Sequence, residues 1–276
     1  MFTSELITKA LEEDIGAGDL TASALLEIGQ KGSASIVAKQ DLVVAGLGVA
    51  GAVFTALDPH VTLAQMCEEG AFARKGQTLM RLQGRLQSLL MAERTALNFL
   101  QRLCGIATLT SQFVSCVKGV RTKILDTRKT TPLLRHLEKY AVRMGGGTNH
   151  RMGLFDEMMI KDNHIAALGG DIVLAIQRAR QAYPSRVLVV EVTTLQQLRS
   201  ISELSFDRVL LDNMSNAQIQ EALDLVRQRF PIEVSGGITL DRVKALSEMG
   251  VDYISVGALT HSAAAADLSL EFETYA

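Results

Sequence analysis

Short apolar runs alternate with amphipathic helical patterns through the second half of the chain. The runs have the length and composition of strands, and a helix-length stretch separates each from the next. They cover Lys123–Leu125, Met158–Ile160, Val187–Val190, Val209–Leu211, Ile232–Val234 and Tyr253–Val256. The helical patterns cover Leu134–Met144, Asp171–Tyr183, Leu195–Leu204, Asn216–Phe230 and Leu240–Met249. Strands that alternate with helices predict βα units, a parallel sheet and an α/β protein.

Consecutive units of this kind predict an incomplete, open β/α barrel, with a doubly wound sheet as the competing arrangement. The preceding part of the chain mixes helical patterns with stretches of strand composition at 35–45, 60–66 and 78–82. We therefore expect an N-terminal α+β sandwich-like domain over residues 1–108 and the β/α barrel over residues 109–265. The C-terminal tail, residues 266–276, is expected to pack back on the N-terminal domain.

Glycines and helical spacing set the expected boundaries inside the N-terminal domain. Gly70, Gly76 and Gly84 predict turns. From about Leu86, apolar residues return at spacings of three, four and seven, which predicts a long helix. This helix is expected to break near Gly105, and a second helix is expected over 109–117.

A polar or small residue follows each strand-like run of the barrel. Parallel strands place all their C-terminal ends on one face, and β/α-barrel enzymes carry their active sites there. The sequence therefore predicts a functional site at this face. The residues that end the six runs are Asp126, Lys161, Glu191, Asp212, Ser235 and Gly257.

Cations gather between the first two of these strand-like runs and at the end of the second. One segment holds the adjacent pair Arg128 and Lys129, and in another a triple glycine leads to His150 and Arg151. Arg presents a planar fork that matches a carboxylate or phosphate, whereas Lys acts as a point charge. A solvated basic loop and a flexible glycine connection are the alternative interpretations. With Lys161 at a further strand end, the pattern indicates a site for a small, strongly anionic substrate.

Two carboxylates, Glu191 and Asp212, end successive strands. A buried acid is costly unless it is paired or coordinates a ligand. Pairing with Lys161 or Arg128 is one interpretation. The others are binding of sugar hydroxyls, ligation of a hard divalent cation, and stabilisation of developing positive charge.

The last two strand-to-helix turns are small and rich in glycine. Glycine in such turns lets backbone N–H groups converge on a phosphate, and the last two barrel loops are a frequent phosphate site. Small residues also occur there for packing alone, but their occurrence in both turns favours phosphate. The residues concerned are Ser235, Gly236, Gly237, Gly257 and the nearby His261.

Composition narrows the functional class further. The net charge of −2 excludes an overall basic field for nucleic acid or an anionic membrane surface, so anion binding must be local. No apolar run is long enough to cross a bilayer, and the acidic N-terminal segment lacks the features of a signal peptide. Three cysteines outside any CxxC pair indicate reduced thiols and a cytoplasmic protein. Metal-site spacings, nucleophile elbows and dinucleotide-binding glycines do not occur.

A series of motifs along nearly the whole chain resembles the quinolinate phosphoribosyltransferase family. The motifs are EEDIGAGDLT from Glu12, ERTALN from Glu93, DTRKT from Asp126, KYAVR from Lys139, GGGTNHR from Gly145, KDNH from Lys161, LDN from Leu211, VSGG from Val234 and SVGALTH from Ser255. Two positions depart from the family pattern. Leu133 stands where Gly is usual, and Val189 stands where an acidic residue is usual.

The resemblance implies transfer of the phosphoribosyl group of 5-phosphoribosyl-1-pyrophosphate (PRPP) to quinolinate with loss of CO₂. The products would be nicotinate mononucleotide and pyrophosphate, made in NAD biosynthesis with Mg²⁺ as cofactor. Lys129, Lys161, Glu191 and Asp212 are the implied catalytic residues, and the two carboxylates would also serve the metal. The implied substrate-binding residues are Arg94, Arg128, Lys129, His150, Arg151, Lys161, Glu191, Asp212, Ser235, Gly236, Gly237, Gly257 and His261.

The resemblance also implies a homodimer in which Arg94 completes the neighbouring subunit's site. One competing interpretation is a relative with a different substrate, such as the homologue encoded with molybdate transporters. Those proteins tend to alter the DTRKT and KDNH segments, and both are intact here. The other competing interpretation is a non-catalytic protein that binds such metabolites. It predicts loss of a charged strand-end residue, and none is lost.

Overall fold

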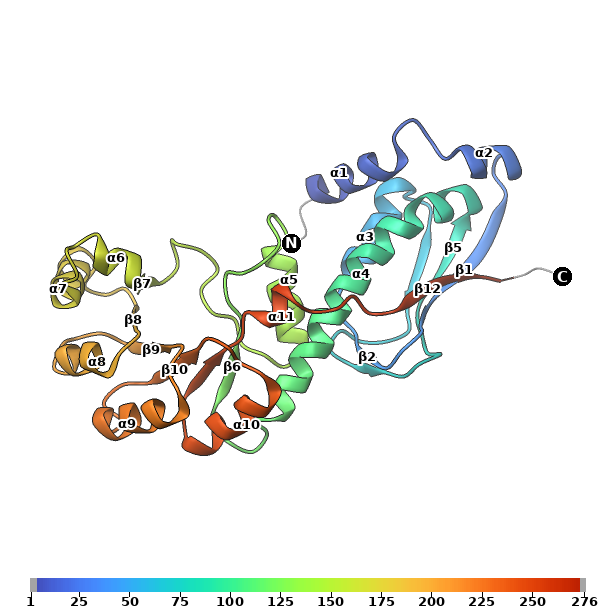
Figure 1. Ribbon diagram of the computed structural model, residues 1–276. Helices are drawn as coiled ribbons and strands as arrows, with labels where there is room; N and C mark the ends of the chain where they lie inside the picture. The colour runs from blue at the N-terminus through green and yellow to red at the C-terminus, as the bar shows by residue number, and fades with distance from the viewer. Residues whose placement is uncertain (1–3, 274–276) are drawn as a thin grey trace. The chain divides into compact units, whose positions relative to one another are not determined.

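Figure 1 shows the computed structural model of the chain, which describes residues 4–273. Residues 1–3 of the predicted N-terminal domain and residues 274–276 of the predicted C-terminal tail lie outside the described residues. The chain divides into two compact units. The antiparallel unit contains residues 4–111, 136–146 and 262–273, and the parallel unit contains residues 112–135 and 147–261.

The antiparallel unit is built on a four-stranded sheet with the strand order β12-β1-β5-β3. Side chains from its inner face are fully buried, among them Ile36, Met80 and Leu82. The sheet includes a strand from the C-terminal segment, because Ala34 to Ala38 pair in antiparallel register with Phe272 to Leu268. The strands are β1 (Lys31–Ala38), β3 (Thr62–Gln65), β5 (Thr78–Arg85) and β12 (Leu268–Phe272), with a separate short pair, β2 (Leu42–Val43) and β4 (Phe72–Ala73).

Two glycine predictions in this unit were wrong. Gly84 does not form a turn; it lies inside β5 opposite Gly32 of β1. Gly105 does not break the long helix, which continues as α4 from Leu86 to Ser115. A Cβ at Gly105 would lie 2.0 Å from the carbonyl oxygen of Ala264, so the glycine serves close packing against that segment. The other helices of this unit are α1 (Ser4–Ile15), α2 (Leu20–Leu25), α3 (Leu47–Leu57) and α5 (Arg135–Met144).

The parallel unit contains a six-stranded sheet with the strand order β6-β11-β10-β9-β8-β7, and every neighbouring pair is parallel. The strands follow one another around the sheet without the reversal of a doubly wound fold. The edge strands β6 and β7 do not pair with each other within residues 4–273, so the sheet stays open. The prediction of an open β/α barrel is thereby confirmed. The strands are β6 (Lys123–Leu125), β7 (Met158–Ile160), β8 (Leu188–Val192), β9 (Arg208–Asp212), β10 (Ile232–Ser235) and β11 (Tyr253–Ser255).

Helices alternate with these strands, and polar residues mark where they begin. Asp171, Thr194, Ser215 and Thr239 each accept a hydrogen bond from a backbone N–H of the first turn, which satisfies a donor that the helix itself cannot. The helix α9 ends at Val226, earlier than expected, because Arg227 adopts a left-handed conformation with φ +47°. The helices are α6 (Asp162–Ala166), α7 (Ile172–Ala182), α8 (Leu195–Ile201), α9 (Asn216–Val226), α10 (Leu240–Met249) and α11 (Ala258–His261).

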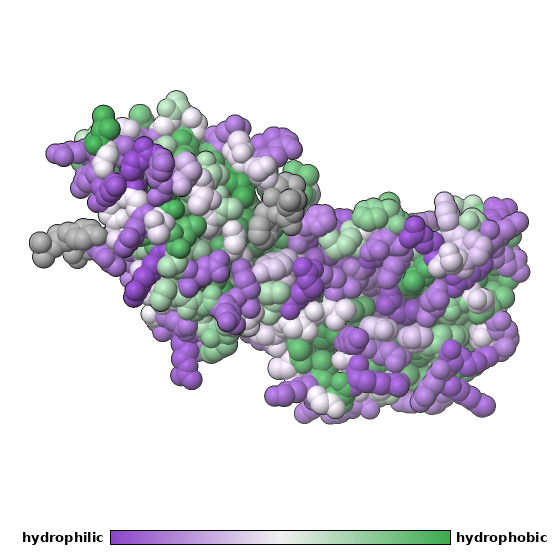
Figure 2. Space-filling view, turned by 180° about the vertical axis from the view of Figure 1, so that it is seen from behind, coloured by the Kyte–Doolittle hydropathy of each residue, from purple (hydrophilic) through white to green (hydrophobic). Residues whose placement is uncertain are grey.

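Hydrophilic residues are spread over the face of the parallel unit that Figure 2 shows, with smaller apolar areas between them. The same pattern follows from the amphipathic helices, which turn their apolar sides to the sheet. Within residues 4–273, no helix combines the length and apolar character needed to cross a membrane.

Candidate active site

A pocket of about 750 Å³ lies at the carboxyl ends of the six parallel strands. Its walls come from all six strand ends and from the segments that follow them, and all of its lining residues belong to the parallel unit. Every predicted site residue except Arg94 lines it. Arg94 is exposed on α4 and belongs to the antiparallel unit. The fold therefore gathers residues that are up to 133 positions apart in the chain, from Arg128 to His261.

Three cations of the pocket have no carboxylate partner within 4 Å among residues 4–273: Arg128, Lys129 and Arg151. The buried Nε of Arg128 also lacks a hydrogen-bond acceptor in this part of the chain. A buried N–H of a charged group is costly unless it is satisfied. This donor and these charges fit an anionic ligand with planar oxygens.

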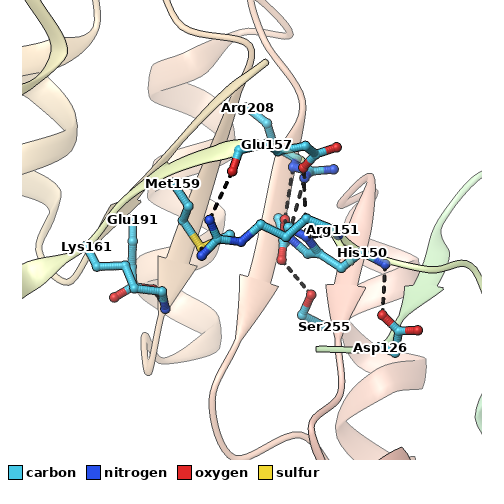
Figure 3. A network of polar contacts seen from close by, with 10 residues as sticks. Asp126, His150, Arg151, Glu157, Met159, Lys161, Glu191, Arg208 and Ser255 are labelled. Carbon is cyan, nitrogen blue, oxygen red and sulfur yellow. Dashed lines mark hydrogen bonds and ion pairs between the residues drawn. The ribbon is translucent and has the colours of Figure 1, made fainter. Parts of the chain in front are cut away.

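The surroundings of Arg151 disfavour its positive charge. Burial lowers the pKa of its guanidinium, and the neighbouring charge of Arg128 lowers it further. The side chain is held by the carbonyl oxygen of Glu157 at 3.0 Å and lies against Met159 (Figure 3). Two cations placed side by side in a half-buried pocket are stabilised when an anion lies between them.

Lys161 and Glu191 form an ion pair inside the pocket, with Nζ 2.7 Å from Oε2 (Figure 3). The Glu191 side chain is almost buried, and Lys161 is its charge partner. One of the interpretations left open for Glu191 was pairing with Lys161, and the structure contains that pair. The strand end is fixed by His164, whose Nδ1 accepts the N–H of Lys161 at 3.0 Å.

The glycine-led segment that carries His150 is anchored by Asp126, which is fully buried. Asp126 accepts the N–H of His150 at 2.8 Å and the side-chain amide of Asn149 at 2.5 Å. Asp126 does not itself line the pocket. Its role is to hold the backbone that presents His150 and Arg151.

Polar contacts on both nitrogens hold the ring of His150 in place. Nδ1 accepts the N–H of Arg151 at 2.7 Å. Nε2 lies 3.4 Å from Oε2 of Glu233, which is fully buried on β10. Arg208 Nε approaches the same oxygen to 3.0 Å, and Ser255 donates to Oε1 at 2.5 Å. The ring is therefore held between the pocket and a buried ionic network (Figure 3).

Arg208 and Glu233 were not predicted as site residues. Glu233 lies inside the strand-like run Ile232–Val234 and Arg208 directly precedes the run Val209–Leu211, whereas the prediction rested on the residues at the strand ends. Side chains two positions apart share one face of a strand, so Arg208 shares its face with Asp212, and Glu233 with Ser235. A charged residue two or four positions before a strand-end residue is the signal that would have found them.

Two adjacent turns form the other wall of the pocket. In the first, Asp212 accepts the side-chain amide of Asn213 at 2.8 Å, and Asn213 adopts a left-handed conformation with φ +56°. The second turn begins at Ser235, whose carbonyl oxygen accepts the N–H of Asn213 at 3.0 Å. Gly236 has φ +90°, and a Cβ there would lie 2.1 Å from Oδ1 of Asn213. Only glycine fits this position, because both the backbone angle and the space exclude a side chain.

The turn after β11 brings Lys129 and His261 together over Gly257. A Cβ at Gly257 would lie 3.0 Å from Cδ of Lys129 and 3.2 Å from Nε2 of His261. The carbonyl oxygen of Lys129 accepts the hydroxyl of Thr260 at 2.7 Å. A glycine at this strand end thus lets a cation approach the turn closely.

Leu133 adopts a left-handed conformation with φ +67° and is exposed. The left-handed conformation suits the glycine that is usual in the family at this position, because glycine adopts such angles without a steric penalty. Leu133 therefore holds this loop in a backbone conformation that is strained for a residue other than glycine.

The fold and the cationic pocket at its strand ends are together typical of a β/α enzyme that acts on an anionic substrate. The family described as quinolinate phosphoribosyl transferase, N-terminal domain, matches residues 19–104, and the C-terminal domain of that family matches residues 106–271. The chain belongs to the quinolinate phosphoribosyltransferase family.

Individual relatives agree with this assignment. The chain is 43% identical over 268 residues to the probable nicotinate-nucleotide pyrophosphorylase [carboxylating] of Bacillus subtilis, covering 97% of this chain and 92% of that protein. The crystal structure of NadC from Streptococcus pyogenes superposes with a TM-score of 0.92 at 40% identity, covering 98% and 96%. Nicotinate-nucleotide pyrophosphorylase from Ehrlichia chaffeensis superposes with a TM-score of 0.95 at 40% identity, covering 99% of both chains.

Proposed function

We propose that this protein transfers the phosphoribosyl group of PRPP to quinolinate and decarboxylates the product. A relative from Nicotiana tabacum is named quinolinate phosphoribosyltransferase [decarboxylating]. The products are nicotinate mononucleotide, pyrophosphate and CO₂, and the reaction belongs to NAD biosynthesis. The observation that carries the proposal is the trio Arg128, Lys129 and Arg151, which have no carboxylate partner within residues 4–273 and line one pocket.

Quinolinate has two adjacent carboxylates on a pyridine ring, and two arginines provide forks of the matching geometry. The ring nitrogen attacks the anomeric carbon of PRPP as the bond from that carbon to pyrophosphate breaks. This carbon develops oxocarbenium character, which Glu191 and Asp212 stabilise from the strand ends. The glycine turns at Gly236, Gly237 and Gly257 receive the 5′-phosphate.

Decarboxylation follows on the quaternary pyridinium formed by this transfer. The bond between the ring and the carboxylate beside the nitrogen breaks, CO₂ leaves, and the electron pair remains on the ring carbon. The positively charged ring nitrogen stabilises this pair until the carbon takes a proton from water. No base is required, so the role of the cations is to hold the substrate in one orientation.

Mg²⁺ fits this pocket as a partner of PRPP. Residues 4–273 contain no cluster of three or more His, Cys, Asp or Glu side chains arranged to hold a metal ion. Mg²⁺ commonly binds through one or two carboxylates together with substrate phosphates and water, and Glu191 and Asp212 supply that number. When bound, the ion neutralises charge on the pyrophosphate leaving group.

We also infer that the enzyme acts in the cytoplasm, which its three unpaired cysteines support. The proposed reaction is tested with quinolinate labelled with ¹⁴C in the carboxyl group that is lost. The purified protein is expected to release ¹⁴CO₂ only when both PRPP and Mg²⁺ are present. Folded protein that releases none under these conditions would exclude the proposed function.

Gly236→Ala is expected to raise the KM for PRPP by about ten- to a hundredfold. The new methyl group meets Asn213 and the backbone angle is strained, so the turn must move away from the phosphate it binds. Steady-state kinetics at saturating quinolinate measure this effect. Gly169→Ala is the matched control, because Gly169 also has a left-handed angle, φ +70°, but faces open space outside the pocket. An equal KM for PRPP in the two variants would contradict the role of the turn.

We propose that the enzyme is a homodimer in which Arg94 completes the site of the partner subunit. This is supported by the exposure of Arg94 on α4 and by its absence from the residues that line the pocket of its own chain. Arg94→Ala and Lys129→Ala are each expected to be inactive, and mixing them is expected to restore up to about a quarter of the activity. A mixed dimer has one site that carries neither substitution. If subunit exchange is demonstrated and no activity returns, each site is complete within one chain.

A further inference from the structure

We propose that Arg242 is a positioning residue for the phosphate-binding wall of the pocket: it fixes the orientation of the glycine turn and ties this turn to the turn that carries Asp212. Arg242 lies in the first turn of α10 and does not line the pocket. It was not among the predicted site residues. The proposal rests on the proposed function, because it assigns the turn to a phosphate of PRPP.

The guanidinium of Arg242 joins two separate turns. Its Nη1 donates to the carbonyl oxygen of Gly236 at 2.6 Å, and its Nη2 donates to the carbonyl oxygen of Met214 at 2.5 Å. Gly236 belongs to the turn after β10, and Met214 belongs to the turn after β9. The two nitrogens of one planar fork therefore hold both turns at a fixed separation. The side chain is half-buried, which strengthens both hydrogen bonds relative to an exposed pair.

The position of the carbonyl groups decides where the neighbouring N–H groups point. In a trans peptide the C=O of one residue and the N–H of the next point in opposite directions. Nη1 of Arg242 also lies 3.5 Å from the carbonyl oxygen of Gly237, so two successive carbonyls face the guanidinium. The N–H groups of Gly237 and Ile238 consequently face the other way, and both residues line the pocket.

Such a pair of N–H groups is suited to a phosphate oxygen. Within residues 4–273, no backbone acceptor takes the N–H of Gly237 or Ile238. Consecutive N–H groups on one side of a turn form a concave site for an anion. Arg242 stabilises this orientation from behind, while its charge adds to the positive potential of the turn.

The second contact of Arg242 connects the phosphate turn to the ribose side of the pocket. Met214 is two residues after Asp212, and Asn213 between them donates to the Asp212 carboxylate. Asn213 also donates its backbone N–H to Ser235, so the two turns are joined at two points. When the guanidinium of Arg242 is removed, one of these connections between the turns is lost and the turns can separate. We expect binding of PRPP to weaken, whereas binding of quinolinate depends on the opposite wall.

The test is steady-state kinetics of Arg242→Met and Arg242→Lys in the full chain, with both substrates varied. Arg242→Met is expected to raise the KM for PRPP about tenfold, which corresponds to one charge-assisted hydrogen bond, and to change the KM for quinolinate less than about twofold. Arg242→Lys keeps the charge but not the fork, so an intermediate rise is expected. Lys244→Met is the matched control, because Lys244 is exposed on the same helix and the substitution removes the same charge.

Three outcomes would overturn the proposal. The first is an unchanged KM for PRPP in Arg242→Met, and the second is an equal rise in the KM of both substrates, as a general loss of structure would give. The third is an unchanged KM for PRPP in Arg242→Lys, because the charge alone would then be sufficient. Failure of the proposed function is distinct from all three, since it would appear as absence of ¹⁴CO₂ release by the unsubstituted protein.

Discussion

Arg208→Met is expected to lower the free energy of unfolding by about 3–5 kcal/mol. Arg208 pairs with Glu233 at 3.0 Å and with Glu157 at 3.2 Å, and its guanidinium lies 5.0 Å from the ring centre of Tyr253. The substitution leaves the fully buried Glu233 carboxylate without its cation. An unpaired buried charge is far more costly than the net gain from the original pair. Urea denaturation followed by circular dichroism measures the change.

Arg199→Met is the matched control for this measurement. Arg199 pairs with Glu221 on the surface, where both side chains are about half exposed, and it is replaced by the same residue. Exposed ion pairs contribute at most about 1 kcal/mol, so the free energy of unfolding of the control is expected to stay close to that of the unsubstituted protein. Similar losses in the two variants would mean that the buried network contributes no more than a surface pair.

The same network makes stability depend on pH. Burial by itself raises the pKa of Glu233, but contact with His150, the charge of Arg208 and the Ser255 hydroxyl outweigh it and leave the pKa below the ordinary value of 4.5. A carboxyl group with a lowered folded-state pKa stabilises the fold above its unfolded pKa, and this contribution is lost as the pH falls through the folded value. Stability carried by Glu233 is therefore expected to be complete at neutral pH and to disappear in acid below about pH 4.5. In Arg208→Met this contribution is expected to be smaller, because the charge of Arg208 no longer lowers the pKa of Glu233.

The open parallel sheet could be predicted from the sequence because its strands and helices differ in period. β6 and β7 begin and end at the predicted residues, and so does α10. The helix α3 could not be recognised in this way, because Leu47, Val49, Ala50, Val53 and Phe54 bury nearly every side of it. A helix that is apolar all around shows no amphipathic period. Its residues therefore resemble the strand-like run before them.

The candidate site was predictable where chemistry coincides with a strand end. Strand ends identify Lys161, Glu191 and Asp212 because each follows or closes an apolar run. They do not identify Arg242, which acts on the turns from a helix, and its contacts with carbonyl oxygens leave no pattern in the sequence. The sequence identifies Glu191 only in part. It lies inside β8, where its neighbour Val190 and all other strand residues are buried, and only the structure shows its pairing with Lys161.

Lys161→Met is expected to lower kcat/KM by about a hundred- to a thousandfold. In the proposed reaction Lys161 contributes positive charge beside the substrate, and methionine has a similar length but no charge. The substitution also leaves Glu191 without the cation that lies 2.7 Å from it. A nearly buried carboxylate without a partner is costly, so the wall of the pocket that carries Glu191 is disturbed as well. Both effects reduce the rate, and ¹⁴CO₂ release measures their sum.

The double variant Lys161→Met/Glu191→Gln separates a catalytic role of Lys161 from a purely structural one. If Lys161 only neutralises Glu191, removal of both charges relieves the unpaired carboxylate, and activity should approach that of Glu191→Gln alone. If Lys161 also acts on the substrate, the double variant should remain at least about tenfold below Glu191→Gln. We expect the second result, because the side chain of Lys161 is 40% exposed to the pocket although it is paired. A cation that served only to stabilise the fold would not need to be accessible to a ligand. A cation that leaves Glu191 to bind a substrate carboxylate must be accessible.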